Sequence, residues 1–171
     1  MNNPYFVNMD ENIEESVQAK GDILITRDPL QDQKKQNEQI KDMINEGIDV
    51  LFLQPVDRNK VRPALELCKK KHIPVVVIDS EVSDTEAVVS TIVSDNYDAG
   101  VQCAKDMMKK KTSANIIIVN QKALNSINER VKGFRDTIKG HPQYKIVEEK
   151  ESAAEFEIAM KVMEEIIYEK K

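Results

Sequence analysis

The sequence predicts an α/β fold in which parallel sheets are flanked by helices. Short apolar runs rich in β-branched residues recur along the chain without polar alternation, which is typical of strands covered on both faces. Amphipathic stretches separate these runs, so strand and helix alternate as in doubly wound folds. The 171 residues, 40% hydrophobic and 32% charged, suffice for one ordinary domain or for two small lobes.

Six apolar runs are predicted as strands. None of them alternates as a strand with one solvated face does, so we expect helices on both sides of each sheet. The runs are Ile23–Thr26, Val50–Leu53, Val75–Ile78, Val89–Val93, Ile116–Val119 and Tyr144–Val147.

The stretches between the strands are predicted as helices, because their apolar residues recur three or four positions apart. Gly21, Gly47 and Gly140 follow such stretches at positions suited to a helix end. Asp57 and Asp95 are predicted helix N-caps. The apolar stripes span Phe6–Val17, Ile40–Ile44, Val61–Cys68, Val101–Met108, Ile127–Ile138 and Ala159–Ile167.

The charge balance and the length of the apolar runs argue against two classes of protein. A net charge of −5 does not favour a nucleic acid partner, whose phosphates attract clustered Lys and Arg. No stretch approaches the roughly 18 apolar residues that a membrane span requires. The first residues also lack the basic and apolar regions of a signal peptide.

The reactive residue types are few and poorly placed for catalysis. Cys68 and Cys103 each fall on the apolar side of a predicted helix and are expected to be buried free thiols. His72 and His141 lie in loops at the end of the sheet opposite to a ligand site. Neither glycine-rich nucleotide-binding pattern occurs, and no Cys/His cluster has metal-ligand spacing. We therefore expect no enzyme activity, no catalytic residue, no cofactor and no metal.

Polar residues follow the predicted strands at their carboxyl ends, where open α/β sheets bind ligands. Gln54, Asp79 and Ser94 each come directly after an apolar run, and Asn120 and Gln121 follow the next one. Amides, hydroxyls and carboxylates suit a ligand with many hydroxyl groups, because each hydroxyl both donates and accepts. The sequence therefore predicts a site for a polyhydroxylated ligand.

Five segments, in this order and spacing, resemble the type I periplasmic binding proteins of sugar ABC importers. They are MNNPYF (1–6), QIKDMINEGIDVLFLQPVD (39–57), KKKHIPVVVIDSEVSD (69–84), IVSDNYDAG (92–100) and NERVKGF (128–134). The ligand domains of lactose-repressor-type regulators are related to this family. The resemblance implies a two-lobe fold, each lobe a parallel sheet flanked by helices, that closes around a sugar.

The resemblance also implies individual ligand contacts. Aromatic residues of the opening turn stack on the sugar, and a carboxylate at a strand end grips its hydroxyls. An arginine of the second lobe clamps the ligand from the other side. The seven implied ligand-binding residues are Asn3, Tyr5, Phe6, Gln54, Asp79, Ser94 and Arg130.

Several of these residues are also compatible with a purely structural role. Asn3 suits a turn before Pro4, and Phe6 also lies on the core face of its helix. Arg130 is equally compatible with a surface ion pair, which contributes little to stability.

Departures from the family pattern leave the identity of the sugar open. Ser80 stands where ribose-type binders carry an arginine, and Ala154 where an aromatic residue is common. The loop Asn120–Asn125 lacks the glycines usual there.

The segments divide the chain where it first crosses between lobes. We expect residues 1–94 to form the N-terminal lobe and residues 95–171 part of the C-terminal lobe. Such folds normally begin with a central strand, whereas this chain begins with a turn and a helix. We therefore expect a fragment that lacks the first strand and the C-terminal part of the fold. Its exposed sheet edges would favour self-association.

The predicted function is sugar or polyol binding by the substrate-binding component of an ABC importer. The implied partner is the membrane permease, and the implied location is the periplasm or, as a lipoprotein, the cell surface. The alternative is the effector-sensing domain of a lactose-repressor-type transcription regulator, which would carry a helix-turn-helix upstream. An enzyme on a similar scaffold is the third hypothesis.

Overall fold

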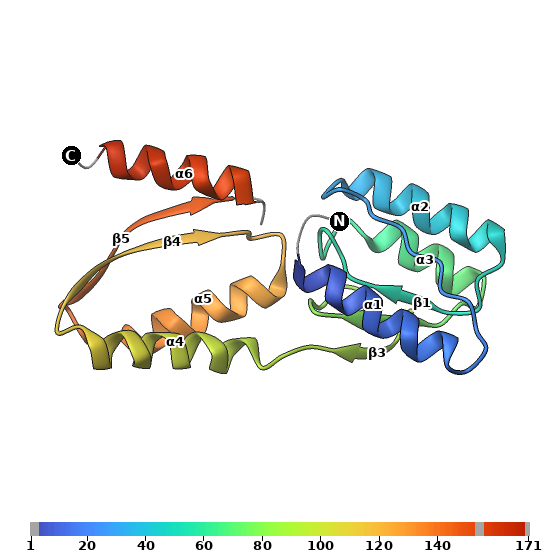
Figure 1. The fold of residues 1–171 in the computed structure, drawn as a ribbon, viewed down its shortest axis with the longest axis horizontal. Helices are drawn as coiled ribbons and strands as arrows, with labels where there is room; N and C mark the ends of the chain where they lie inside the picture. Colours follow the sequence, from blue (N-terminus) through green and yellow to red (C-terminus); the bar gives the residue numbers. More distant parts are fainter. Residues whose placement is uncertain (1–3, 153–155, 170–171) are drawn as a thin grey trace.

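The computed structural model describes residues 4–152 and 156–169, which form two parallel sheets with helices around them. The first sheet has the order β1 (Leu51–Leu53), β2 (Val75–Ile78), β3 (Val88–Ile92), and the second pairs β4 (Ala114–Asn120) with β5 (Tyr144–Glu151). Figure 1 shows the sheets in two separate bodies, here called lobe 1 (4–92) and lobe 2 (96–152 and 156–169). The predicted α/β class with helix-flanked parallel sheets is confirmed.

Lobe 1 combines the first sheet with α1 (Pro4–Gln18), α2 (Gln33–Glu46) and α3 (Arg62–Lys70). Its core is one cluster of aliphatic side chains from α2, α3, β1 and β2. Val75, Val77 and Cys68 in this cluster have an exposed fraction of 0%. The core therefore fixes the strands whose carboxyl ends carry the predicted ligand contacts.

The ends of α2 follow directly from the sequence. The Asp32 carboxylate accepts hydrogen bonds from the main-chain N–H groups of Lys34 and Lys35, which lack partners within the helix. Gly47 ends α2 with a φ of 89°, a left-handed conformation that favours glycine. The predicted helix end at Gly47 is confirmed.

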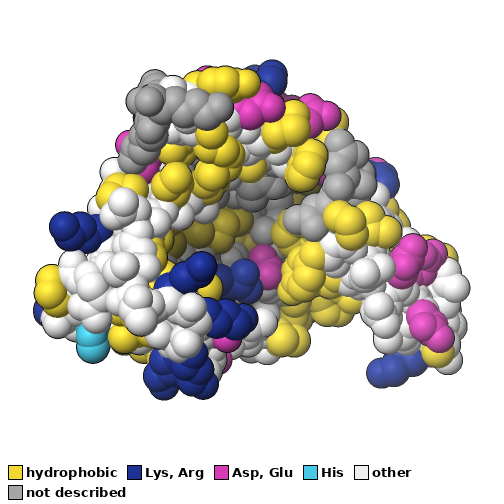
Figure 2. Space-filling model, turned by 60° about the vertical axis from the view of Figure 1, so that its left-hand side comes forward, with side chains coloured by type: hydrophobic (Ala, Val, Ile, Leu, Met, Phe, Trp, Pro, Cys, Tyr) yellow, Lys and Arg dark blue, Asp and Glu magenta, His cyan; other side chains and the backbone are white. Residues whose placement is uncertain are grey.

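Lobe 2 is built on the β4–β5 sheet. Figure 1 shows α4 (Asn96–Lys110) and α5 (Asn125–Ile138) on one side of this sheet and α6 (Phe156–Glu169) on the other. Asp95 caps α4 as predicted, because its carboxylate accepts from the N–H of Asp98. On α6, Phe156 is 82% exposed. Figure 2 shows a hollowed face bordered by hydrophobic side chains, with Lys and Arg side chains gathered beside it.

Two glycines allow α4 and α5 to cross at very short distance. A Cβ atom on Gly100 would overlap the main-chain carbonyl of Arg130, and one on Gly133 would overlap the carbonyl of Tyr97. The atoms in the way belong to the backbone, so they cannot rotate aside. The crossing fixes the main chain of Arg130 against α4.

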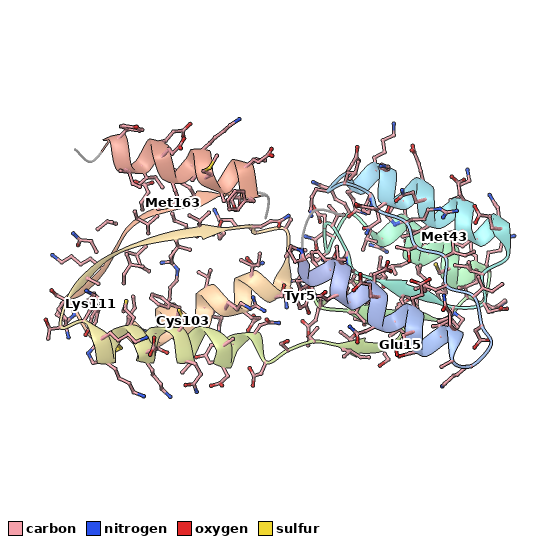
Figure 3. All side chains as sticks on the ribbon, viewed as in Figure 1. Tyr5, Glu15, Met43, Cys103, Lys111 and Met163 are labelled. Carbon is pink, nitrogen blue, oxygen red and sulfur yellow. The ribbon has the colours of Figure 1, made fainter. Side chains whose placement is uncertain are left out.

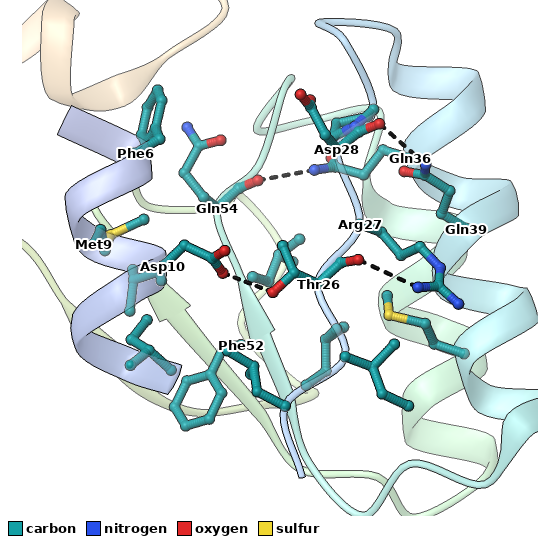
Figure 4. Close-up of a pocket in the computed structure, with 18 of the residues that line it drawn as sticks. Phe6, Met9, Asp10, Thr26, Arg27, Asp28, Gln36, Gln39, Phe52 and Gln54 are labelled. Atoms are coloured by element: carbon teal, nitrogen blue, oxygen red, sulfur yellow. Dashed lines mark hydrogen bonds between the residues drawn. The ribbon is translucent and has the colours of Figure 1, made fainter. Parts of the chain in front are cut away.

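The predicted strand at Ile23–Thr26 is wrong. In the structure this segment is extended but forms no strand, and Thr26 donates its hydroxyl hydrogen to the Asp10 carboxylate of α1. A groove of about 2020 Å³ lies beside this segment and is lined by residues of the segment, of α1, α2 and β1, and of α6 (Figure 4). A strand requires a main-chain partner, and the apolar character of the segment alone does not supply one.

Two further expectations need correction. Cys68 is buried as predicted, but Cys103 is exposed, because it lies one position before the buried Ala104 on α4. Asp57 does not cap α3, whose N-cap is Val61. Its carboxylate instead accepts from the N–H groups of Asn59 and Lys60 in the turn that precedes this helix.

Among the described residues, no helix combines the length and apolarity needed to cross a membrane.

Candidate functional site

Four of the predicted ligand contacts gather around one carboxylate. The Asp79 carboxylate at the end of β2 accepts hydrogen bonds from the Tyr5 hydroxyl and the Gln54 side chain, and it lies in the field of the Arg130 guanidinium. Tyr5 begins α1, Gln54 follows β1, and Arg130 belongs to α5 of lobe 2. Figure 3 places Tyr5 where lobe 1 faces lobe 2. The cluster therefore joins residues from both lobes.

The electrostatics of the cluster reflect partial burial. Burial raises the pKa of the Asp79 carboxyl above its usual value, although the Tyr5 hydrogen bond, the Arg130 charge and the Gln54 hydrogen bond each oppose this shift. Burial also raises the pKa of the Tyr5 phenol, and the Asp79 carboxylate adds to that rise through its charge and its hydrogen bond. The Tyr5 phenol therefore stays neutral and donates its hydroxyl hydrogen to the Asp79 carboxylate.

The backbone at Asp79 has a positive φ, which residues other than Gly, Asn and Asp rarely adopt. Its φ is 68°, and the Ser80 N–H bonds back to the Ile78 carbonyl at 2.8 Å. A bond from residue i+2 to residue i around a positive φ is a γ-turn, which is strained. The Asp79 N–H is fixed by the Ile92 carbonyl of β3 at 2.9 Å. The turn ends β2 abruptly and sends Asp79 and Ser80 to different neighbours.

Arg130 is oriented by Asn96, a residue outside the seven predicted ligand contacts. Its Nε donates to the Asn96 side-chain oxygen at 2.8 Å, and Asn96 is only 7% exposed at the start of α4. The glycine crossing described above holds the main chain of Arg130 beside the same helix. In the sequence, Asn96 lies in the segment IVSDNYDAG and directly follows the helix cap Asp95.

The aromatic pair of the opening turn does not form a flat platform. The rings of Tyr5 and Phe6 meet edge to face, with centroids 5.3 Å apart and planes at 74°. Tyr5 is 54% exposed and bonds Asp79, whereas Phe6 lines the groove beside the segment 23–26, to which α6 of lobe 2 also contributes (Figure 4). The two side chains therefore have different surroundings.

One other predicted contact, Ser94, does not join the cluster, and another, Asn3, lies outside the described residues. Ser94 lies exposed in the extended segment between β3 and α4. Ala154 also lies outside the described residues.

At the carboxyl end of β4, two amide side chains are buried with acceptor oxygens that have no hydrogen-bond partner within residues 4–152 and 156–169. These are Asn120, 4% exposed, and Gln121, 8% exposed. The Asn120 amide nitrogen does have a partner, the Glu149 carboxylate at 2.6 Å. Buried acceptors without a donor are costly, so these oxygens are suited to a bound water or ligand hydroxyl.

The described residues contain no group of three or more His, Cys, Asp or Glu side chains suited to a metal ion.

The fold and the site together define a class of protein: two α/β lobes with parallel sheets and a polar cluster contributed by both lobes. The chain belongs to the family described as periplasmic binding protein domain, whose model matches residues 1–170. The resemblance to type I periplasmic binding proteins is thus confirmed.

Relatives of known name are import or sugar-binding proteins. The ribose import binding protein of Bacillus subtilis is 32% identical over 104 residues, which cover 61% of this chain and 34% of the relative. The ribose import binding protein of Haemophilus influenzae is 28% identical over 144 residues, covering 82% of this chain and 49% of the relative. The chain thus spans half or less of the length of these relatives.

Solved structures agree on the fold. An ABC transporter solute binding protein from Mycobacterium smegmatis with bound glycerol superimposes with a TM-score of 0.92 at 27% identity, covering 98% of this chain and 59% of that one. A myo-inositol binding protein from Caulobacter gives a TM-score of 0.88 at 24% identity, covering 97% and 57%. The second match supports the fold alone.

Proposed function

We propose that this chain binds a sugar or polyol between its two lobes, as the substrate-binding component of an ABC-type importer. The observation that carries the proposal is the cluster around Asp79, to which lobe 1 contributes Tyr5 and Gln54 and lobe 2 contributes Arg130. The named relatives are import binding proteins, which favours this function over the effector domain of a regulator. Binding without chemical conversion of the ligand is part of the proposal.

The chemistry of the cluster suits a polyhydroxylated ligand. A carboxylate accepts from two neighbouring hydroxyls at once, with charge-assisted strength. Tyr5, Gln54 and Arg130 supply donors around that carboxylate, and each can exchange its present partner for a ligand hydroxyl. Closure of two lobes that each hold part of the site would complete the contacts, and the ligand would stabilise the closed form.

The roles of the seven predicted residues form part of the same proposal. Asp79 accepts from the ligand hydroxyls, Arg130 clamps from lobe 2, and Tyr5 offers both its hydroxyl and its ring. Four further residues complete the proposed contacts, with Phe6 shared between the ligand and the groove: these are Asn3, Phe6, Gln54 and Ser94.

The remaining assignments follow from this function. We propose residues 1–94 and 95–171 as the two lobes of the binding protein. The partner in transport would be the membrane permease, which recognises the closed form, and the location would be the periplasm or, as a lipoprotein, the cell surface. No nucleic acid partner is proposed, in line with the net charge of −5.

We also propose that copies of the chain self-associate through open strand edges. Within residues 4–152 and 156–169, β1 pairs with β2 on one side only, and its other edge faces the groove, where Phe52 is 43% exposed. Unpaired strand edges with apolar neighbours recruit further strands. Sedimentation velocity at rising concentration should detect dimers or larger species, and Phe52→Lys should reduce them. Gln102→Lys on the exposed surface of α4 is the control, and a monomer at every concentration would refute this proposal.

Titration calorimetry of the full chain against pentoses, hexoses and polyols tests the binding proposal. One or more of these ligands should bind, and Asp79→Asn should weaken that binding by about tenfold or more, since a charge-assisted hydrogen bond is lost. Asp84→Asn is the matched control, because Asp84 lies five residues away and forms an ion pair with Arg62 instead. Failure of the whole panel to bind or to raise the melting temperature would contradict the proposal.

A further inference from the structure

We infer that Arg58, Ser80, Glu81 and Asn125 form a latch that holds lobe 1 against lobe 2 and thereby sets the distance between Asp79 and Arg130. The inference deepens the proposed function, and its consequence for ligand affinity rests on that function. The latch residues are positioning residues, because the contacts described below join them to Asn125, Ser126 and Ala123 of the other lobe or to each other.

Asn125 is the centre of the latch. Its side-chain oxygen accepts a hydrogen bond from the Arg58 guanidinium, and its amide nitrogen donates to the Glu81 carboxylate at 2.7 Å. Both partners belong to lobe 1, whereas Asn125 is the first residue of α5 in lobe 2. A single amide thus uses its acceptor and its donor on two oppositely charged residues of the other lobe, which an apolar or acidic side chain could not do.

The second contact joins a helix end to a buried hydroxyl. The N–H of Ser126 donates to the Ser80 hydroxyl oxygen at 3.2 Å, and both residues are buried. Leu124, the N-cap residue of α5, makes no side-chain capping bond. The first N–H groups of a helix lack partners within it, so Ser80 of lobe 1 supplies a cap that lobe 2 does not provide for itself.

Main-chain contacts support the same interface. The Arg58 N–H donates to the Ala123 carbonyl at 3.3 Å, across the lobes. Within lobe 1, the Arg58 guanidinium is held by the Ser83 hydroxyl at 3.1 Å, and the Ser83 N–H donates to the Arg58 carbonyl at 3.0 Å. The lobe 1 half of the latch is therefore oriented before it meets Asn125.

The covalent connection alone gives the lobes freedom to move. Within the described part of the chain, the backbone passes from lobe 1 to lobe 2 through residues 93–95, which lie exposed between β3 and α4. An exposed segment of this length absorbs changes in backbone angles and acts as a hinge. Contacts away from that segment are needed to define one lobe arrangement.

The latch lies on the same turn as the proposed ligand acceptor. Ser80 and Glu81 directly follow Asp79, whose γ-turn directs Asp79 to Tyr5 while Ser80 meets α5. On the lobe 2 side, Asn125 and Ser126 start the helix that carries Arg130. When the latch opens, the start of α5 moves away from the turn at Asp79. Because Arg130 lies on α5, it moves away from Asp79 as well.

The test measures the distance between the lobes without ligand. Nitroxide labels on the exposed Cys103 of α4 and on Lys41→Cys of α2 report this distance by double electron–electron resonance, while the buried Cys68 stays unlabelled. The parent chain should give a narrow distribution. Asn125→Ala and Ser80→Ala should each broaden it and shift it to longer distance.

Two further variants separate the latch from a general loss of structure. Asn128→Ala is the matched control, because Asn128 is an asparagine on the same helix whose amide donates to the Lys122 carbonyl of its own lobe. It should leave the distribution unchanged. The double variant Asn125→Asp with Glu81→Gln should restore the narrow distribution, since the new carboxylate accepts from Arg58 and from the new amide.

The ligand arm uses the sugar or polyol that binds best in the calorimetric panel. Asn125→Ala should weaken its affinity by about three- to tenfold, chiefly through faster dissociation, because the closed form is less populated. Parent-like distances in both alanine variants would overturn the latch. Altered distances with unchanged affinity would overturn its positioning role. If distances change as expected but no sugar binds the parent chain, the latch stands and the proposed function fails.

Discussion

Lobe 1 and lobe 2 bury their apolar side chains to different extents. The core cluster of lobe 1 joins buried residues of two helices and two strands and includes Leu65, 1% exposed, and Val75, 0% exposed. Among the described residues of lobe 2, the corresponding cluster joins Ala104, Ile138 and Tyr144 with partly buried neighbours, and Ile166 of α6 is buried apart from it. Side-chain burial thus stabilises lobe 1, whereas lobe 2 depends more on the close crossing of α4 and α5.

The two halves of the candidate site are therefore held in place by different contacts. Asp79 and Gln54 follow strands anchored in the larger core, so their positions are fixed by packing. Arg130 is positioned by a glycine contact, by Asn96 and by the contacts of α5 with lobe 1. We expect substitutions in lobe 1 to cost more stability, and substitutions in lobe 2 to alter the site with a smaller loss.

The largest effect is expected from a truncation in the core of lobe 1. Leu65→Ala should lower the free energy of unfolding by about 2–5 kcal/mol, because it removes apolar contacts and leaves a cavity. Urea unfolding followed by circular dichroism measures this change. Leu30→Ala is the control, since Leu30 is 65% exposed and its truncation should cost no more than about 0.5 kcal/mol. Equal effects of the two variants would contradict the central role of this core.

The next effect concerns the helix crossing of lobe 2. Gly100→Ala should destabilise the protein by about 1–3 kcal/mol, because the added methyl group meets the backbone of α5 and forces the helices apart. It should also weaken ligand binding, since Arg130 moves with that backbone. Ala99→Ser, at the exposed neighbouring position, should change neither property. A Gly100→Ala variant with parent stability would show that the crossing is not tightly packed.

A smaller effect is expected from the strained turn at Asp79. Asp79→Gly and Asp79→Ala both remove the carboxylate, but only glycine adopts a φ of 68° at little cost. The glycine variant should therefore be more stable than the alanine variant by about 1 kcal/mol. Thermal unfolding of the two variants, side by side, measures the difference. Equal melting temperatures would indicate that the γ-turn relaxes once the side chain is removed.

The smallest effect is a pH dependence. The pKa of Asp79 is raised by burial in the folded state, so the folded protein binds this proton more tightly than the unfolded chain does. The contribution of Asp79 to stability is therefore fully present below its usual pKa of 3.8 and is lost as the pH rises through the folded pKa. Asp79→Asn, which does not titrate, should gain stability relative to the parent chain over that interval. An opposite slope in unfolding measurements from pH 3 to pH 7 would reverse the sign assigned to this group.

The sequence predicted the strands and helices that depend on the residues of their own segment. The strands in the buried runs Val50–Leu53 and Val75–Ile78 end within one residue of their predicted limits. An apolar run flanked by helices is stable as a strand that the helices cover. Ile23–Thr26 has the same apolar character and forms no strand, because pairing depends on a neighbour that is distant in the sequence. Cys103 was misplaced because a single step along a helix turns a side chain by about 100°.

The candidate site divides in the same way. Tyr5, Gln54 and Asp79 lie close together because the carboxyl ends of β1 and β2 and the start of α1 share one edge of lobe 1, and Arg130 approaches them from α5. Three features of the site could not be predicted from the sequence. They are the γ-turn at Asp79, the hydrogen bond of Asn96 to Arg130 and the capping of α5 by Ser80 of lobe 1. Each depends on main-chain angles or on contacts between segments whose spacing only the folded chain determines.

The glycine crossing also has an evolutionary consequence. Gly100 and Gly133 have no room for a side chain, so any mutation at either position changes the spacing of α4 and α5. Such a change displaces Asn96 and Arg130 together, because one lies on each helix. New ligand specificities in this lineage should therefore arise by exchange of side chains on a conserved helix pair, and both glycines should persist where ligand preferences diverge.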